Sequence, residues 1–313
     1  MPHTLSADPI FTDWRAETGR VWGGVAQRLR HRLHEHPLFS NEALAQLIDI
    51  YPRRHYSLVQ WGEHGQRSAW REGEIGDLTG AQVIEAIGAS RVWINLRNAP
   101  MVDPRYRTLL DEIFDELATR MPGFDTVNRT MGILISSPKS RTLYHCDLPG
   151  QSLWQIRGRK RVFVYPTTAP FLRPEHVEGI ALRGVEVDMP YESWYDEHAQ
   201  IFDIEPGDML HWPLNAPHRV DNFDCLNVSM TLEYFTDEIR RSHMVTRANG
   251  ILRTQFGLAP RSHVTHGAGF WMKAALQKGL RNLPAVRGMD RPRKRPDFRL
   301  DPTKPGAIAE IAA

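Results

Sequence analysis

A change of hydrophobic period at Thr130 constrains the fold more than any other feature of the sequence. Upstream of it, apolar residues recur at helical spacing, whereas downstream they form short strand-like runs. Gly, Pro, Asn and Asp separate these runs, as is typical of turns between strands. Many short strands at this spacing predict a closed antiparallel barrel or a jelly roll. The runs are Gly132–Ser136, Ser152–Ile156, Val162–Tyr165, Gln200–Ile204, Met209–Trp212, His218–Val220 and Asn227–Tyr234.

The regions on either side of these runs are predicted to be mostly helical. Asn41, Thr79 and Asp103 are suitable N-caps, and Thr236 is a further one after the last strand. We therefore predict a mainly β fold with α: a jelly-roll core over 126–235, a mostly helical region over 1–125 and a basic helical region over 236–313. The predicted helices are Asn41–Ile50, Thr79–Ile87, Asp103–Met121 and Gly269–Leu283, with a strand at Arg91–Leu96 and an irregular arm over Arg287–Pro305.

Charge is distributed unevenly, although the formal net charge is only +2. Residues 240–304 hold 15 Lys and Arg against 3 Asp, a balance of +12, whereas residues 1–239 hold 24 against 33 acidic residues, a balance of −9. The basic tail could contact an anionic partner or a membrane surface. We favour packing on the acidic body or on a second subunit. Charge apart, no nucleic-acid-binding motif is present.

The amphipathic segment Gly269–Leu283 carries an apolar stripe of Met272, Leu276, Leu280 and Leu283. It could lie on a membrane, dock on its own domain or form a homodimer. The expected compartment is the cytoplasm. The first residues do not resemble a signal peptide, no apolar run reaches the ~20 residues of a membrane span, and two cysteines are too few for a disulfide framework.

His145 and Asp147 are the first candidates for a metal site. Two ligands on one strand need to be two residues apart, because alternate side chains share a face. His218 is the best third ligand: it follows the apolar run Met209–Trp212 and a Pro-containing turn, at the start of another strand. Two histidines and one carboxylate on one face of an octahedron are typical of catalytic Fe(II) sites. The His-x-Asp pair alone is a weak signal and the hairpin that carries His218 is a more specific one, and together they predict such a site.

The segment 207–222 resembles the second cupin signature, with Gly207, Pro213, His218 and Asn222 in register and Asn215 in place of a glycine. In the first signature, His145-x-Asp147 replaces a histidine pair and Gln151 replaces the glutamate ligand, while Gly158 is in register. Loss of the fourth ligand and a histidine exchanged for a carboxylate make the chain similar to the JmjC-type, cupin-like Fe(II)/2-oxoglutarate oxygenases. The resemblance covers roughly 130–235.

This resemblance implies Fe(II) bound by His145, Asp147 and His218, with 2-oxoglutarate as cosubstrate and O2 as oxidant. It places the cation for the distal carboxylate at Lys160, thirteen residues after Asp147, and a hydroxyl donor at Thr142. Gln151 is expected to point at cosubstrate or substrate. The implied activity is hydroxylation of a small molecule, a lipid intermediate or a protein side chain, with release of succinate and CO2.

Two other functions stay open at this point. The chain could be a metal cupin acting as an isomerase or as a 2-oxoglutarate-independent dioxygenase, although Gln151 and the His-x-Asp pair disfavour this. It could also be a non-catalytic cupin that binds a ligand or partner, which the complete triad and Lys160 disfavour. His211, in an apolar strand, is expected to be a hydrogen-bonded core residue, and Glu233 could reach the pocket from the strand that follows His218.

Overall fold

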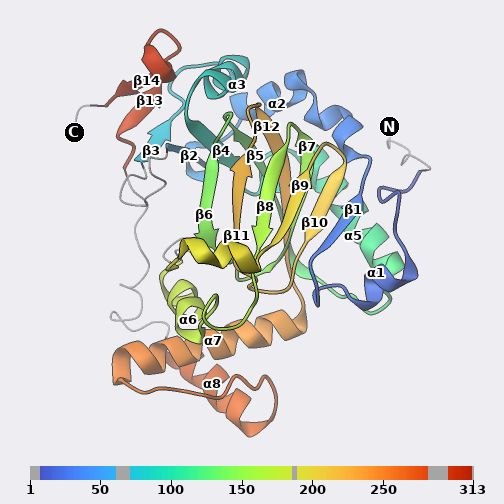
Figure 1. Cartoon of the computed structure of the whole chain (residues 1–313), viewed down its shortest axis with the longest axis vertical. Coiled ribbons are helices and arrows are strands. Elements are labelled where there is room, and N and C mark those ends of the chain that lie inside the picture. Colours follow the sequence, from blue (N-terminus) through green and yellow to red (C-terminus); the bar gives the residue numbers. More distant parts are fainter. Residues whose placement is uncertain (1–7, 61–70, 185–188, 281–294, 312–313) are drawn as a thin grey trace.

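The computed structural model describes residues 8–60, 71–184, 189–280 and 295–311. Two sheets, antiparallel except at the β3–β13 pair, face each other and enclose a barrel (Figure 1). In spatial order, the small sheet comprises β6 (Arg141–His145), β11 (His218–Asn222), β8 (Lys160–Val164) and β9 (Gln200–Ile204). The large sheet comprises β1 (Gln27–Arg30), β10 (Asp208–His211), β7 (Gly150–Arg157), β12 (Asn227–Phe235), β5 (Val127–Ser136), β4 (Val92–Leu96), β2 (Tyr56–Gln60), β3 (Arg71–Glu74), β13 (Phe298–Leu300) and β14 (Ile308–Glu310).

From β5 to β12 the chain passes back and forth between the two sheets. Strands β5, β7, β10 and β12 belong to the large sheet, and β6, β8, β9 and β11 form the small one. This is the arrangement of a double-stranded β-helix, so the predicted jelly-roll core is confirmed. All seven predicted strands are present, with ends that differ by a few residues.

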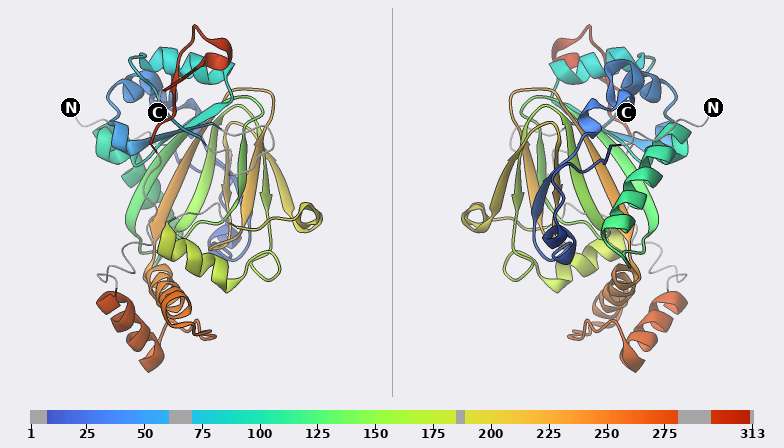
Figure 2. Two further views of the ribbon diagram at one scale, coloured as in Figure 1. Left: turned by 90° about the vertical axis from the view of Figure 1, so that its left-hand side faces the viewer. Right: turned by 90° about the vertical axis from the view of Figure 1, so that its right-hand side faces the viewer.

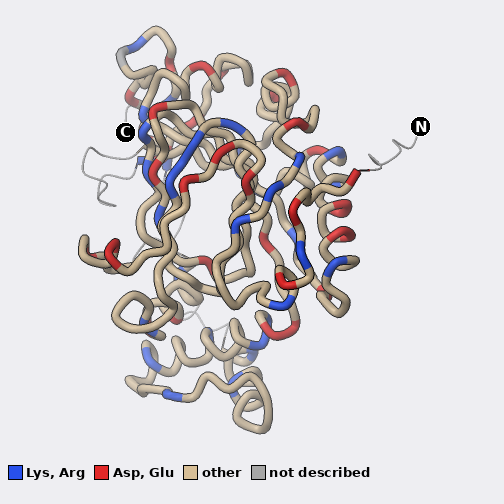
Figure 3. Tube along the Cα trace, turned by 45° about the vertical axis from the view of Figure 1, so that its right-hand side comes forward, with Lys and Arg blue, Asp and Glu red and all other residues tan. Residues whose placement is uncertain are grey.

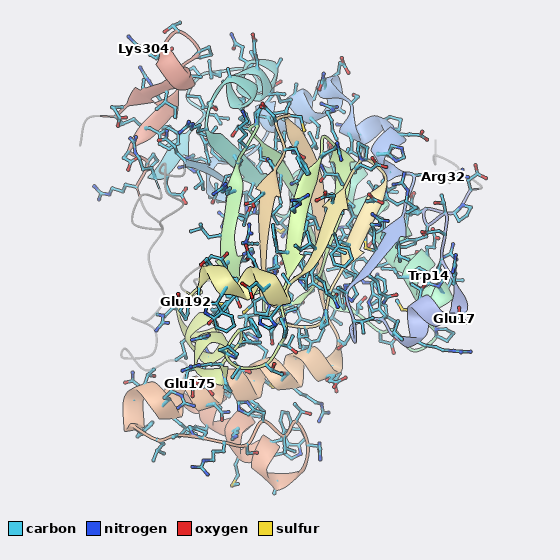
Figure 4. All side chains as sticks on the ribbon, in the orientation of Figure 1. Trp14, Glu17, Arg32, Glu175, Glu192 and Lys304 are labelled. Atoms are coloured by element: carbon cyan, nitrogen blue, oxygen red, sulfur yellow. The ribbon has the colours of Figure 1, made fainter. Side chains whose placement is uncertain are left out.

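Side-chain alternation along β12 decides what lies inside the barrel. Val228, Met230, Leu232 and Tyr234 point away from the small sheet into the main apolar core. The intervening residues therefore face the barrel interior, because successive side chains of a strand point to opposite faces. Side chains from both sheets occupy the space between them (Figure 4). The interior face of β12 is polar: Asn227, Ser229, Thr231 and Glu233.

The outer face of the large sheet is covered by helices from the N-terminal region (Figure 2). Asp103 caps α5 and Thr79 caps α3, as predicted, but Ser40 caps α2 and Asn41 is its first helical residue. The apolar face predicted for α5 is buried. The helices of this region are α1 (Ala16–Arg20), α2 (Asn41–Asp49), α3 (Gly80–Ala89), α4 (Ala99–Val102) and α5 (Pro104–Arg120), with 3-10 turns at η1 (Leu33–Glu35), η2 (Pro37–Phe39) and η3 (Arg53–His55).

The N-terminal region is less helical than predicted, because it supplies β1, β2 and β3 in addition to the predicted strand β4. These strands extend the barrel's large sheet: β4 pairs with β5, and β1 pairs with β10. The C-terminal arm differs from its prediction as well, because Phe298–Leu300 forms β13 and pairs in parallel with β3. Such short strands take their stability from pairing partners distant in sequence, so local pattern identifies them poorly. The domain boundaries stay a prediction.

The remaining helices lie at the end of the molecule opposite the C-terminal hairpin, whose Lys304 is labelled in Figure 4. Thr236 caps α7, as predicted. In α8 the predicted stripe is wrong at its start: Phe270 is buried, whereas Met272 is 69% exposed. Leu283 lies outside the described residues. In the described part of the chain, no helix combines the length and apolarity needed to cross a bilayer. These elements are α6 (Pro174–Arg183), α7 (Asp237–Phe256), α8 (Gly267–Leu280) and η5 (Ser193–His198), whereas η6 (Pro305–Ala307) lies within the C-terminal hairpin.

Candidate metal centre

The structure brings His145, Asp147 and His218 together at one end of the small sheet. His145 ends β6 and His218 begins β11, and the two residues are direct partners across the ladder. Contrary to the prediction, Asp147 does not share a strand with His145 but lies in the loop after β6, with its carboxylate 3.4 Å from Nε2 of His218. All three are buried, and one ligand atom from each lies within 4.8 Å of the others. This spacing leaves room for one shared metal ion.

Backbone carbonyls fix the orientation of both imidazoles. Nδ1 of His145 is 2.7 Å from the Leu143 carbonyl, and Nδ1 of His218 is 3.0 Å from the Ala216 carbonyl. A carbonyl only accepts hydrogen bonds, so each Nδ1 carries the proton and each Nε2 keeps a free lone pair. Outer hydrogen bonds of this kind orient metal-binding histidines.

Asn215 holds the loop that carries the third ligand. Its backbone is left-handed, with φ 59°, a conformation that asparagine tolerates better than most residues and that suits the glycine of the cupin signature. Its side-chain amide donates to the Asp147 carbonyl at 2.5 Å. The substitution noted in the sequence therefore keeps the turn and adds a contact to the ligand loop.

The electrostatics of the triad favour a cation. Burial, and secondarily the nearby Glu233 carboxylate, raises the pKa of Asp147 to about 8. Burial, followed by the neighbouring His145, lowers the pKa of His218 well below its usual value. A divalent ion reverses this balance, since it stabilises the carboxylate and binds neutral imidazole. Two nitrogen donors and one oxygen donor, with no thiolate, fit Fe(II).

Gln151, which is expected to point at cosubstrate or substrate, contacts a metal ligand in the structure. With its amide nitrogen oriented toward Asp147, Gln151 donates to both carboxylate oxygens, one of them at 3.0 Å. Its place at the start of β7, just after the ligand loop, explains this contact. His211 supports the same residue from behind: the ring is buried and its Nδ1 donates to the Gln151 carbonyl at 2.7 Å. His211 is thus a hydrogen-bonded core histidine, as predicted.

Lys160 points into the barrel, whereas its two basic neighbours point out. Strand β8 starts at Lys160, two residues earlier than predicted, and Lys160 shares the interior face with Val162 and Val164. Its side chain is buried, and among the described residues it has neither a hydrogen bond nor an ion pair. Burial lowers its pKa to about 7. Arg159 and Arg161 are exposed, and Arg161 pairs with Asp203.

Thr142 reaches the interior because of a β-bulge. Three residues separate it from His145, and in a regular strand this odd spacing would put the two side chains on opposite faces. The register between β6 and β11 shifts between His218 and Val220, so that Thr142 is opposite Val220 while His145 is opposite His218. An extra residue in one strand is what defines a bulge. Both side chains therefore face inward.

Sequence reasoning missed Asn95 in β4. Its Oδ1 is buried without a hydrogen-bond partner. It faces the interior near Gly132, where an added Cβ would lie 3.3 Å from this Oδ1 and 2.8 Å from Oγ1 of Thr231. A polar residue in the apolar run RVWINL was the available signal.

The family model of the cupin-like domain matches residues 92–239. This segment is a cupin-like domain. No curated protein sequence matches the chain. The X-ray structure of E. coli ycfD aligns with a TM-score of 0.50 at 16% identity, over 93% of this chain and 76% of that one. A structure of the Escherichia coli ribosomal oxygenase YcfD with cobalt and 2-oxoglutarate gives a TM-score of 0.44 at 15% identity, over 88% and 70% of the two chains. At this identity the first similarity establishes a shared fold.

Proposed function

We propose that this cupin-like protein is an Fe(II)- and 2-oxoglutarate-dependent dioxygenase that hydroxylates a C–H bond of a substrate not yet identified. One oxygen atom of O2 enters succinate and the other enters the product alcohol, and the C1 carboxylate of 2-oxoglutarate leaves as CO2. The observation that carries this proposal is Lys160, a buried cation without a partner among the described residues, on the interior face of the sheet that supplies both histidines.

We assign each residue a role from its position in the barrel. His145, Asp147 and His218 would hold ferrous iron, which when bound supplies the activation of dioxygen. Three protein ligands leave three positions of an octahedron for a bidentate 2-oxo acid and O2. A buried cation needs an anionic partner, and the distal carboxylate of the cosubstrate provides one for Lys160.

Neighbouring residues orient these groups and exclude water. Thr142, on the interior face of the bulged strand, would donate its hydroxyl to the cosubstrate, and Gln151 would orient the Asp147 carboxylate. The apolar side chains of Val162, Val164 and Leu210 line the interior between the sheets. A dry cavity strengthens each electrostatic contact within it.

Succinate formation and cosubstrate binding test the proposal together. Protein purified without oxygen is supplied with Fe(II), 2-oxoglutarate and O2, and succinate is followed over time. Because turnover without substrate can be slow, 2-oxoglutarate binding is measured in parallel by calorimetry with Mn(II) as the metal. We expect binding by the wild type and by the exposed control Arg159→Ala, and loss of binding in His145→Ala and Lys160→Ala. A wild type that binds no 2-oxoglutarate, or variants that bind it equally well, would refute the proposal.

The setting and partners of the protein are separate proposals. We infer a cytoplasmic protein, consistent with two free cysteines. We also infer a homodimer through the C-terminal helices, because Phe256, Trp271 and Met272 are all more than half exposed. Light scattering of wild type and Trp271→Glu tests the homodimer by measuring the molar mass in solution.

An anionic partner for the basic tail is the remaining proposal. Basic residues occur along α7 and α8 (Figure 3), while Arg291, Arg293 and Lys294 lie outside the described residues.

A further inference from the structure

Cys225 lies in the turn that joins β11 to β12, at the end of the barrel opposite the metal centre. Strand β11 begins at the ligand His218 and runs away from the metal centre to Asn222, three residues before Cys225. Cys225 is partly exposed, whereas Cys146, the other cysteine of the chain, is fully buried. An oxidant in solution therefore reaches Cys225 more readily than Cys146.

The sulfur of Cys225 faces the start of β8. The backbone N–H of Arg159 donates to Sγ at 3.3 Å, and the side-chain amide of Asn227 donates to it at 3.7 Å. The backbone N–H of Phe223 also fixes this turn to β8, because it donates to the Arg159 carbonyl at 3.1 Å. N–H donors hold a charged acceptor more strongly than a neutral one. The two donors at Sγ can therefore stabilise a negatively charged product formed there.

Lys160 follows Arg159 and provides an observation that is independent of the cysteine. Its side chain is 4% exposed, and across residues 8–60, 71–184, 189–280 and 295–311 it has neither a hydrogen bond nor an ion pair. Burial lowers its pKa to about 7, and negative charge on Cys225 acts in the opposite direction. A buried ammonium group needs an anion. When no cosubstrate is bound, an anion formed at Cys225 would meet this need.

We propose that Cys225 is a site of oxidation by hydroperoxides, and that the sulfinate formed there pairs with Lys160 and excludes the distal carboxylate of 2-oxoglutarate. This inference rests on the proposed function, in which Lys160 binds that carboxylate. The buried ammonium group then has two competing anions, one dissolved and one covalently attached. The attached anion is favoured because its effective concentration is high. Oxidation of Cys225 should therefore weaken cosubstrate binding.

The oxidation consumes two molecules of hydrogen peroxide for each Cys225. In the first step the thiolate sulfur attacks one peroxide oxygen, the O–O bond breaks and hydroxide leaves, so that sulfur is oxidised to a sulfenic acid and peroxide is reduced. The sulfenic acid then gives its proton to the hydroxide. In the second step the sulfenate takes one oxygen atom from a second peroxide, which leaves as water. The product is a sulfinate, with one negative charge and two acceptor oxygens.

Peroxide treatment of the metal-free protein tests the modification and its effect together. After the peroxide has been removed with catalase, peptide mass spectrometry counts the oxygen atoms on Cys225, and calorimetry with Mn(II) measures 2-oxoglutarate binding. We expect two added oxygen atoms on Cys225. The affinity of treated wild type for 2-oxoglutarate should be lower by about tenfold or more. Treated Cys225→Ser should keep its affinity, whereas treated Cys146→Ala should lose it as wild type does.

A charge introduced at position 225 by substitution tests the contact without peroxide. Cys225→Asp supplies a carboxylate, and Cys225→Asn is its neutral isostere. Urea unfolding of the metal-free protein at about pH 6, where Lys160 is mostly charged, compares the two variants with Lys160 present and with Lys160→Met. The unfolding equilibrium constant should favour Cys225→Asp over Cys225→Asn by about tenfold more when Lys160 is present. Cys225→Asp should also bind 2-oxoglutarate more weakly than Cys225→Asn.

The outcomes separate this inference from the proposed function. If untreated wild type binds 2-oxoglutarate, three results overturn the inference and leave the proposed function standing: no oxygen added to Cys225, an affinity that oxidation leaves unchanged, or an equal loss in treated Cys225→Ser. If untreated wild type binds no 2-oxoglutarate, the proposed function fails. The substitution pair then still decides about the contact, since coupling between position 225 and Lys160 supports it and the lack of coupling overturns it.

Discussion

Replacing Lys160 by methionine should make the metal-free protein more stable while abolishing cosubstrate binding. Methionine keeps the length and most of the volume of the side chain but removes the charge. In the free protein, burial lowers the pKa of Lys160 from 10.5 to about 7. At about 1.4 kcal/mol for each tenfold change in proton affinity, this corresponds to roughly 5 kcal/mol of destabilisation at low pH and roughly 4 at pH 7. These figures are upper bounds, and we expect a gain of about 1 to 4 kcal/mol.

The sign of the pH dependence provides a further check. Between about pH 7 and 10.5 the folded protein binds fewer protons at Lys160 than the unfolded chain does. The destabilisation is therefore fully present below pH 7 and disappears as the pH approaches 10.5. The stability gain of the variant should shrink across the same range.

Urea unfolding of the metal-free protein at several pH values measures this gain, and calorimetry with Mn(II) measures 2-oxoglutarate binding. Arg159→Met is the matched control, since Arg159 is the exposed residue just before Lys160. It should change neither quantity appreciably. A Lys160→Met variant that is less stable than wild type at pH 7, or that binds 2-oxoglutarate normally, would contradict the role given to Lys160.

Three further outcomes follow from the site. His218→Ala should abolish thermal stabilisation by Mn(II), whereas His211→Ala should lose about 1 to 3 kcal/mol of stability and still bind the metal; equal metal binding by both would remove His218 from the ligand set. Affinity for 2-oxoglutarate should fall about tenfold per pH unit above pH 7, because binding then takes up a proton at Lys160, and a flat calorimetric profile would argue against this. Thr142→Val should weaken 2-oxoglutarate binding about threefold to tenfold with Mn(II) binding unchanged; an unaltered affinity would exclude a hydroxyl contact.

Short-range sequence patterns predicted the strands and helix starts that depend on interactions between residues close in sequence. Alternation and turn residues located seven of the eight barrel strands, all but β6, and Asp103 and Thr79 marked helix starts because capping is a short-range interaction. The same reasoning missed β1, β6 and β13, whose pairing partners lie far away in the sequence, and it also missed β2 and β3. It could not explain Thr142, because an odd spacing from His145 faces inward only when a bulge shifts the register against β11.

The alternating sequence of β12 shows why a site needs more than a pattern. Polar and apolar residues alternate from Asn227 to Tyr234, which is equally typical of a strand with one face in solvent. In the structure both faces are covered, and the polar face divides along its length. At one end Gln155 donates to Asn227 and accepts from Ser229, so these groups satisfy each other. At the other end, the hydrogen bond that Glu233 makes within the described part of the chain is the long one from Thr130. A polar wall that is satisfied at one end and deprived of partners beside the metal ligands is built to receive a ligand there.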